Sequence, residues 1–321
     1  MSVSYVNPVC RDYFADPFVW KTGDTYYAVG TGPAADDKTR ASVFPMMSSP
    51  DLVHWKPEGW ALNGLEDGCG DAYWAPEVAY ADGVFYLYYS VGHGHKSHKL
   101  RVATSENPLG PYTDIGCPIS DPAIPFAIDA HPFRSADGEW HLFYCRDFLD
   151  SDDNVRPGTA IVADRLIDMT RLAEDEHVVA RASRDWQRFR ANREMYGGVY
   201  DWHTLEGPSV LERDGKYYCF YSGGCFENDT YGVDYVVADN VFGPYTDDKP
   251  HSPRILRTVA DRVIGPGHNS FVTGPDGKTT YIVYHAWDKP MTARRMCIDK
   301  LRWTTDGPVV DGPTWTEQRT G

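Results

Sequence analysis

The chain has 321 residues, of which 42% are hydrophobic and 24% are charged, a composition typical of globular proteins and not of disordered or fibrous ones. Its formal net charge of -15 argues against nucleic acids, anionic membranes and polyanionic substrates, because such partners need a basic surface. We therefore expect a neutral substrate and neither a nucleic-acid nor a membrane partner.

Two features of the sequence bear on the protein's location. The N-terminus, MSVSYVNPVCRDYF, has no basic stretch followed by an apolar run, and no apolar segment is long enough to span a bilayer. The seven cysteines are an odd number without a C-x-x-C pair, which predicts free, buried thiols. From the sequence as given we expect a cytoplasmic protein, or a secreted one if a signal peptide was removed.

One pattern of two strands recurs five times along the chain. Each copy has an apolar strand, a tight turn with glycine and a second strand dense in aromatic residues. Such turns between β-branched and aromatic runs are typical of antiparallel hairpins. The copies are ADPFVWKTGDTYYAVGTG from Ala15, APEVAYADGVFYLYYSVG from Ala75, DAHPFRSADGEWHLFYCRD from Asp129, EGPSVLERDGKYYCFYSGG from Glu206 and GHNSFVTGPDGKTTYIVYHAWD from Gly267.

Segments between the copies supply further strands. They include MMSSPDLVHWKPEG, LRVATSENPLGPYTD and DYVVADNVFGPYTD, of which the last two share an ending. Two hairpin strands and one or two more make the sheet of a propeller blade, and five blades account for the chain. We therefore predict an all-β fold, a five-bladed β-propeller. Residues 165–204 depart from the pattern, and we expect a short helix or long loop there that shapes the rim of a site.

Ionisable residues stand at matching places in four copies. Asp129, Glu206 and His268 each lie nine residues before the glycine of their turn, and Asp16 lies seven before its own. Offsets of equal parity place side chains on the same face of a strand, because side chains alternate with a period of two. The first strand of each blade lines the central channel of a propeller, so we expect three carboxylates and an imidazole to converge there.

Converging carboxylates point to acid–base chemistry. Most acids at strand starts simply cap turns. Bringing three together costs stability unless a site uses the resulting split between their pKa values. Glycoside hydrolysis uses such a split, since it needs one protonated acid and one ionised carboxylate.

The chain resembles glycoside hydrolase family 43 over essentially its whole length. The resemblance rests on the order and spacing of ADPFV, YWAPEV, AIDAHPF, EGPSV, GPGHNSFV and ARRMCIDKLRWTTDGP. It implies an inverting glycosidase, with residues 1–321 as a single catalytic propeller domain. By motif, Asp16 matches the general base, Glu206 the general acid with a raised pKa, and Asp129 the third acid that orients Glu206 and tunes its pKa.

The resemblance also implies a role for His268, which matches a channel histidine that binds a calcium ion or a water cluster. Calcium prefers oxygen ligands, and we expect no organic cofactor. A separate histidine tract, His93, His95 and His98, has a spacing that a transition metal could use, but no cysteine or carboxylate accompanies it closely. We interpret it as a solvated loop at the channel mouth.

Substrate-binding residues are expected near the family motifs. An arginine close to the acids would keep Asp129 ionised. For Tyr231 and Tyr235 the sequence allows two roles, a platform on which a sugar stacks or packing within a blade. The predicted substrate-binding residues are Trp74, Trp202, Trp287, Arg294 and Arg295, the two arginines because the register of the matching motif is ambiguous.

The ending HAWD followed by ARRMCIDKLRW is most similar to arabinan-directed members of the family. It implies an exo-acting α-L-arabinofuranosidase on arabinan or arabino-oligosaccharides, with β-xylosidase and endo-arabinanase as alternatives. Sucrose and fructan hydrolases share the fold but retain configuration and carry WMNDPN and RDP segments, where this chain reads FADPFV and AIDAHPF. A non-catalytic carbohydrate-binding propeller is the alternative from another class. The sequence leaves the oligomeric state open.

Overall fold

The computed structural model describes residues 2–33, 42–66, 68–246, 248 and 250–321. Within these ranges the protein is built of strands, and the only helical element is the 3-10 turn η1 (Asp185–Gln187). No helix in the described part of the chain is long and apolar enough to cross a membrane.

All five predicted hairpins are present. In each, an apolar strand and an aromatic strand pair antiparallel across the glycine turn. They are β2 (Ala15–Thr22) with β3 (Thr25–Thr31), β6 (Ala72–Ala81) with β7 (Val84–His93), β10 (Ala127–Arg134) with β11 (Trp140–Phe148), β16 (Gly198–Arg213) with β17 (Lys216–Gly223), and β19 (Ile264–Thr273) with β20 (Thr280–Trp287).

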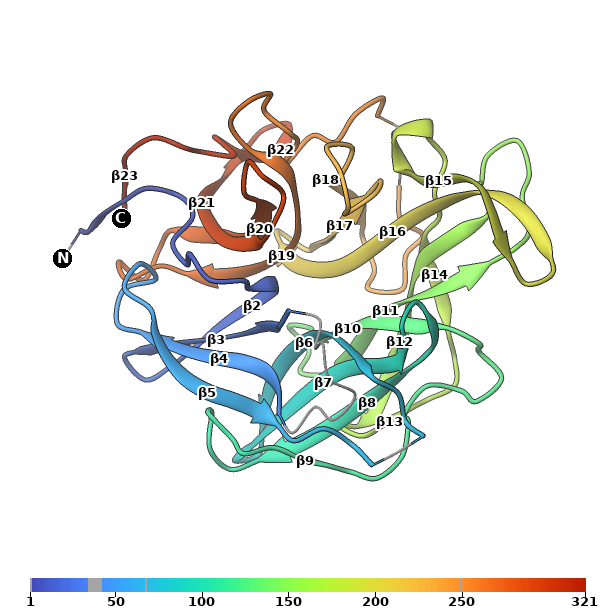
Figure 1. The fold of residues 1–321 in the computed structure, drawn as a ribbon, viewed down its shortest axis with the longest axis horizontal. Coiled ribbons are helices and arrows are strands. Elements are labelled where there is room, and N and C mark those ends of the chain that lie inside the picture. The colour runs from blue at the N-terminus through green and yellow to red at the C-terminus, as the bar shows by residue number, and fades with distance from the viewer. Residues whose placement is uncertain (1, 34–41, 67, 247, 249) are drawn as a thin grey trace.

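Further strands extend each hairpin outward into a blade, and the blades surround a common centre (Figure 1). The fold is the predicted five-bladed β-propeller. The fourth blade has isolated bridges from β18 to Thr246 and to Leu256 in place of a fourth strand. The outer strands are β4 (Val43–Ser49) and β5 (Lys56–Leu62) in the first blade, β8 (Lys96–Ser105) and β9 (Thr113–Asp114) in the second, β12 (Gly158–Asp168), β13 (Arg171–Leu172) and β14 (His177–Ala180) in the third, β18 (Gly232–Ala238) in the fourth, and β21 (Arg294–Thr304) and β22 (Gly307–Val310) in the fifth.

The third and fourth blades are joined into one nine-stranded sheet. A short parallel pairing links β12 to β16, with Gly158 opposite His203 and Thr159 opposite Thr204. A Cβ atom at Gly158 would lie 1.9 Å from the His203 carbonyl oxygen, so only glycine permits this contact. At the other side of the ring, β1 (Ser4–Tyr5) pairs with β23 (Gln318–Arg319), and Figure 1 shows the two chain ends side by side.

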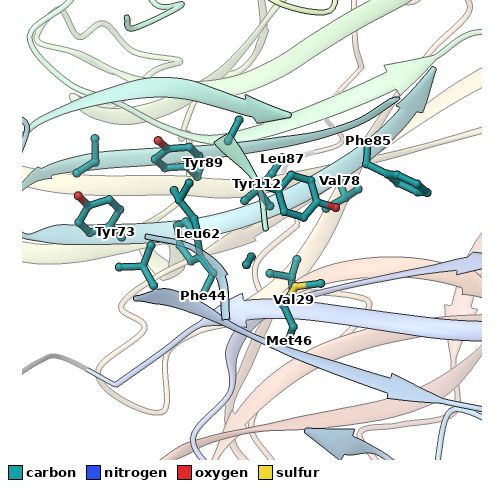
Figure 2. Packing of buried hydrophobic residues seen from close by; sticks show 14 residues of the cluster. Val29, Phe44, Met46, Leu62, Tyr73, Val78, Phe85, Leu87, Tyr89 and Tyr112 are labelled. Carbon is teal, nitrogen blue, oxygen red and sulfur yellow. The ribbon is translucent and has the colours of Figure 1, made fainter. Parts of the chain in front are cut away.

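The hydrophobic core lies between the blades. Each of five clusters of buried residues fills the space between one pair of neighbouring blades. Figure 2 shows the cluster between the first two blades, where Phe44 meets Tyr73 and Tyr89 edge-on at ring-centroid distances of 6.1 and 5.5 Å. Aromatic pairs in this geometry add stability beyond their buried area. Much of the high aromatic content therefore serves packing between blades.

The segment 165–204 is mostly β-structure, where we expected a helix or loop. It contains the end of β12, strands β13 and β14, η1, and β15 (Arg188–Met195), which forms a projecting hairpin with β16 (Figure 1). The predicted short helix amounts to the three residues of η1. The seven cysteines are free as predicted, and five of them are buried.

Candidate active site

The first strand of every blade is interrupted by a β-bulge. The first residue of the bulge has a left-handed φ, between 47° and 58°, in all five blades. A bulge re-aims the side chain that it carries, and here it does so at the same height around the ring. The five bulge residues are Asp16, Ala75, Asp129, Gly207 and His268.

Glu206 lies one residue before the bulge of its blade, so its place in the repeat differs from that of Asp16, Asp129 and His268. The prediction that all four positions are equivalent was wrong for Glu206. Counting back from the turn glycine is unreliable, because the number of residues between bulge and turn differs from blade to blade. All four side chains nevertheless line one cavity of about 370 Å³, as the sequence predicted.

Hydrogen bonds between neighbouring blades hold the bulges in place. In three blades the backbone N–H of the bulge residue donates to a side chain on the second strand of the preceding blade. These bonds run from Asp16 to His285 Nδ1 (3.1 Å), from Ala75 to Thr31 Oγ1 (2.9 Å) and from His268 to Ser222 Oγ (2.7 Å). The position of each bulge is thus set by the adjacent blade.

At the fourth blade, the acceptor for the bulge N–H is Asp129, which lies on the first strand of the third blade. The residue at the corresponding place in the third blade is Cys145, which pairs with Ile128 and has only a weakly accepting sulfur. The N–H of Gly207 donates instead to Oδ2 of Asp129, at 2.9 Å. Gly207 also approaches the ring of His268, which a Cβ atom would meet at 3.1 Å. Asp129 therefore fixes the backbone directly beside Glu206.

Asp16 is surrounded by cationic and polar nitrogen atoms. Its Oδ1 accepts a hydrogen bond from Arg294 Nη1 at 3.0 Å and lies 3.5 Å from His268 Nδ1. Burial alone would raise the pKa of Asp16, but Arg294, and after it His268, more than offset this and hold that pKa well below its ordinary value. Asp16 is therefore ionised at neutral pH.

His285 approaches the same carboxylate without forming an ion pair. Burial lowers the pKa of His285 to about 4, so the ring is neutral at neutral pH. Its Nδ1 accepts the backbone N–H of Asp16, and it therefore carries no proton to share with the Asp16 side chain 3.2 Å away. His285 positions the backbone of Asp16.

Glu206 has the opposite electrostatic environment. Burial, and after it the neighbouring Asp129, raise the pKa of Glu206 to about 7. The hydroxyl of Tyr231 donates to Oε1 at 2.6 Å and partly offsets this rise. Burial also raises the pKa of Asp129, to about 6, although His268 acts against it. Glu206 therefore holds a proton near neutral pH, as the sequence predicted.

The structure distinguishes the two candidate arginines. Arg294 lines the cavity and also contacts the Tyr13 hydroxyl, at 3.0 Å from Nη2. Arg295 instead bonds to Asp288 at 3.1 Å and is not among the residues of the cavity wall. The expectation that an arginine keeps Asp129 ionised was wrong, because the guanidinium pairs with Asp16 and the pKa of Asp129 is raised.

The three candidate tryptophans lie in different environments. Trp74 lines the cavity and stacks on His98 at a ring-centroid distance of 3.7 Å. Trp202 is 0% exposed and therefore cannot stack on a sugar, so its predicted role was wrong. Trp287 donates its indole N–H to the carbonyl of the wall residue Phe226 at 2.6 Å and does not line the cavity itself. Of the three, only Trp74 is positioned to contact a substrate.

The histidine tract spans the end of β7, the turn and the start of β8, and it is only partly solvated. His98 is buried, its ring contacts the Gly94 carbonyl through Nε2 at 2.8 Å, and burial lowers its pKa to about 4. His95 lines the cavity, which agrees with the expected place at the channel mouth. His93 is not part of the wall.

Several residues of the wall carry no family motif and were missed in the sequence. Tyr231, for which the sequence allows a stacking or a packing role, donates to Glu206 and is not itself part of the wall. The missed residues of the wall lie on rim segments outside the repeat, where no pattern marks them. They include Tyr13, Phe126, Phe189, Arg193 and Phe226.

Calcium at His268 was expected from the family resemblance, and the surrounding donors do not fit a protein-held ion. Within the described residues there is no group of three or more His, Cys, Asp or Glu side chains placed to hold a metal. The nearest carboxylate, Asp16, is already paired with Arg294. Calcium binding stays a prediction.

Comparisons with known proteins agree with this site. The family described as "Glycosyl hydrolases family 43" matches residues 5–309. A β-D-galactofuranosidase of Aspergillus niger is 30% identical over 95% of this chain and 84% of its own length. An extracellular exo-α-(1→5)-L-arabinofuranosidase of Streptomyces avermitilis is 26% identical over 98% of this chain, which spans 65% of that relative. The crystal structure of a thermostable family-43 glycoside hydrolase matches with a TM-score of 0.82 and 31% identity over 98% of both chains. The chain belongs to glycosyl hydrolase family 43 and is a glycoside hydrolase.

Proposed function

We propose that this protein is an inverting, exo-acting α-L-arabinofuranosidase on arabinan or arabino-oligosaccharides. The observation that carries the chemistry is the divergence of pKa values within one cavity: that of Asp16 is lowered and that of Glu206 is raised. Divergent pKa values of paired acids assign the base and the acid of a hydrolytic site.

Each acid then has one task. Glu206 gives its proton to the glycosidic oxygen while the bond to the anomeric carbon breaks. Asp16 takes a proton from a water molecule that attacks the opposite face of the sugar, which inverts the configuration. The water oxygen becomes the new anomeric hydroxyl, Asp16 releases the proton it accepted to solvent, and Glu206 regains a proton from solvent.

Three neighbours support these steps. Arg294 keeps Asp16 ionised until it accepts the proton, and Tyr231 fixes the rotamer of Glu206. Asp129 raises the pKa of Glu206 and holds the Gly207 backbone beside it. Asp129 is therefore a positioning residue for the acid.

The size of the cavity favours a terminal sugar. Its volume of about 370 Å³ is near the lower end of the range for ligand pockets, ~300–1,000 Å³. The relative from S. avermitilis is named as an exo-arabinofuranosidase, which supports the same choice here. The relative from A. niger favours a second candidate, a β-D-galactofuranosidase.

A panel of substrates tests the proposal. Purified enzyme is assayed on the p-nitrophenyl glycosides of α-L-arabinofuranose, β-D-galactofuranose and β-D-xylose, and on linear arabinan. We expect the highest kcat/KM on the arabinofuranoside, and a dominant rate on another glycoside would replace the assigned sugar. Proton NMR of the first product should show the inverted anomer, and a retained anomer would contradict the roles of Asp16 and Glu206.

Two variants separate an enzyme from a binding protein. Asp16→Ala and Glu206→Ala should lower turnover by about 10²-fold or more, since each group acts in the transition state. A non-catalytic sugar-binding propeller would show no turnover to lose and unchanged binding in both variants. Circular dichroism and thermal melting confirm that the variants fold.

The location is tested separately. The sequence as given predicts a cytoplasmic protein, whereas the relative from S. avermitilis is named as extracellular. Immunodetection in the culture medium and in the lysate of the source organism decides between the two.

A further inference from the structure

A second hollow, a groove of about 920 Å³, adjoins the cavity that holds the acids. The two share His95, Phe126, Arg193 and Met195 in their walls. The groove is bordered by the β7–β8 turn, the segment before β10 and the β15–β16 hairpin. These parts belong to the second, third and fourth blades, whereas Asp16 lies on the first.

The groove therefore lies on the side of the acid Glu206. Glu206 is on β16, which pairs directly with the β15 strand of the groove wall. In the proposed function Glu206 protonates the oxygen of the leaving group. The leaving part of the substrate is then the part that extends into the groove.

The charge of the groove is opposite to that of the cavity and of the whole protein. Its charged lining residues are three cations, Lys96, Arg190 and Arg193, and one anion, Glu194. The cavity has five carboxylates in its wall and two arginines. A cationic groove in a chain of net charge -15 favours an anionic ligand at this place.

Arg193 is the residue best placed to bind that ligand, because its charge is unpaired. It is half-buried, with its guanidinium over the rings of Phe189 (5.0 Å) and Trp202 (5.6 Å). Among the described residues it makes no hydrogen bond or ion pair, whereas Arg190 bonds to Glu227 at 3.0 Å. An arginine held by aromatic faces with its donors free matches the planar, two-oxygen geometry of a carboxylate.

The nearby carboxylate Asp147 compensates the charge of Arg193 only in part, because it raises the pKa of the guanidinium less than burial lowers it. It accepts hydrogen bonds from Tyr196 (2.7 Å) and Thr159 (2.8 Å) and forms no ion pair with the guanidinium. Burial lowers the pKa of Arg193, which reflects the unfavourable desolvation of this cation. An acceptor supplied by a ligand would offset that desolvation.

We propose that the groove binds a sugar residue that carries a carboxylate, a uronic acid, in the leaving part of the substrate, and that Arg193 binds this carboxylate. The direction of the substrate rests on the proposed function. The acid-lined cavity then takes the neutral terminal sugar that the net charge of -15 favours, whereas the cationic groove beside it accepts an acidic one.

Two aryl α-L-arabinofuranosides of equal shape test the proposal. One has a 4-carboxyphenyl leaving group and the other a 4-carbamoylphenyl group, so only the charge at the far end differs. We expect Arg193→Gln to lower kcat/KM at least about tenfold more for the carboxylate than for the amide, since hydrogen bonds to charged groups are the stronger ones. Comparing each substrate between wild type and variant cancels the difference in leaving-group reactivity.

Further variants separate charge from structure. Arg193→Lys keeps the cation and should retain part of the preference. Arg302→Gln removes an exposed arginine that pairs with Asp311 on the fifth blade and should leave both rates unchanged. An equal loss on both substrates in Arg193→Gln, with an unchanged melting temperature, would overturn the proposal.

A binding measurement is independent of turnover. Titration calorimetry with digalacturonate and with neutral galactobiose should show binding of the acid to wild type and at least about tenfold weaker binding to Arg193→Gln. Digalacturonate binding without hydrolysis of any arabinofuranoside would refute the proposed function and keep the anion site. Equal binding of the two disaccharides would refute the anion site alone.

Discussion

The hydroxyl of Tyr231 donates a hydrogen bond of 2.6 Å to Oε1 of Glu206, the group with the raised pKa. Tyr231 is itself buried and stacks on His285 at 5.8 Å, so its ring is held independently of the acid. Because the bond stabilises ionised Glu206, Tyr231→Phe should raise the pKa of Glu206 further. We expect the alkaline limb of the pH profile of kcat/KM to move upward and kcat to fall about tenfold. A lower kcat with an unmoved limb would contradict this role.

The pH profile of the wild-type enzyme follows from the two acids. Glu206 must be protonated, so kcat/KM should fall as pH rises through about 7. Asp16 must be ionised, and its lowered pKa places the acidic limb well below pH 4. Initial rates on p-nitrophenyl arabinofuranoside, measured in overlapping buffers, test both limbs. A flat alkaline side would contradict the role of Glu206 as the acid.

Arg294 sets the acidic limb. Arg294→Gln removes the main group that lowers the pKa of Asp16, and burial, which raises that pKa, then acts with less opposition. The acidic limb should move to higher pH while the alkaline limb stays in place. Arg295→Gln, which removes the pair with Asp288, is the matched control and should leave the acidic limb unmoved.

Glu206 lowers the stability of the folded protein above neutral pH. A carboxyl whose pKa is raised by folding, here from 4.5 to about 7, destabilises the native state progressively between these values and fully above them. Glu206→Gln should therefore raise the melting temperature by a few degrees at pH 8 and by much less at pH 4. Scanning calorimetry at the two pH values measures the difference, and an equal change at both would mean that ionisation is not the cause.

Trp74 and Trp202 should differ in what their replacement changes. Trp74→Ala removes a wall of the cavity and should raise KM about tenfold, because stacking on a sugar is lost. Trp202→Phe leaves a gap in a buried network with Thr159, so it should lower the melting temperature by a few degrees with little change in KM. A KM effect from Trp202→Phe comparable with that of Trp74→Ala would contradict this division.

The repeat in the sequence was sufficient to predict the blades, because each hairpin carries its own turn glycine and alternating strands. The acids Asp16, Asp129 and Glu206 could be predicted as well, because each lies in a short motif that is recognisable in the local sequence. The sequence did not show that Glu206 lies one residue before its bulge, since a bulge adds a residue to a strand without a recognisable residue type. The partner of Arg294 and the burial of Trp202 depend on contacts between blades, which no local pattern encodes.

The residues at the rim of the cavity could not be predicted from the sequence either. Arg193 and Phe189 belong to the β15 strand, which occurs only once and therefore matches nothing elsewhere in the chain. Tyr231 lies before β18, near the outer part of its blade in sequence, yet its hydroxyl reaches the centre. Only the three-dimensional arrangement shows that these side chains face the acids.

The bulges at Asp16 and at Gly207, beside Glu206, are held by hydrogen bonds to the neighbouring blades, whereas the groove is shaped by a hairpin whose turn lies outside the five repeats. Bond cleavage and the shape of the groove are thus encoded in separate stretches of the chain. Changes at the hairpin turn, at Tyr196 and Gly197, lie nine or more residues before Glu206, whose own pairing with Ser222 on β17 they leave in place. This gives a lineage a route to new polysaccharides in which the hydrolytic machinery is inherited unchanged.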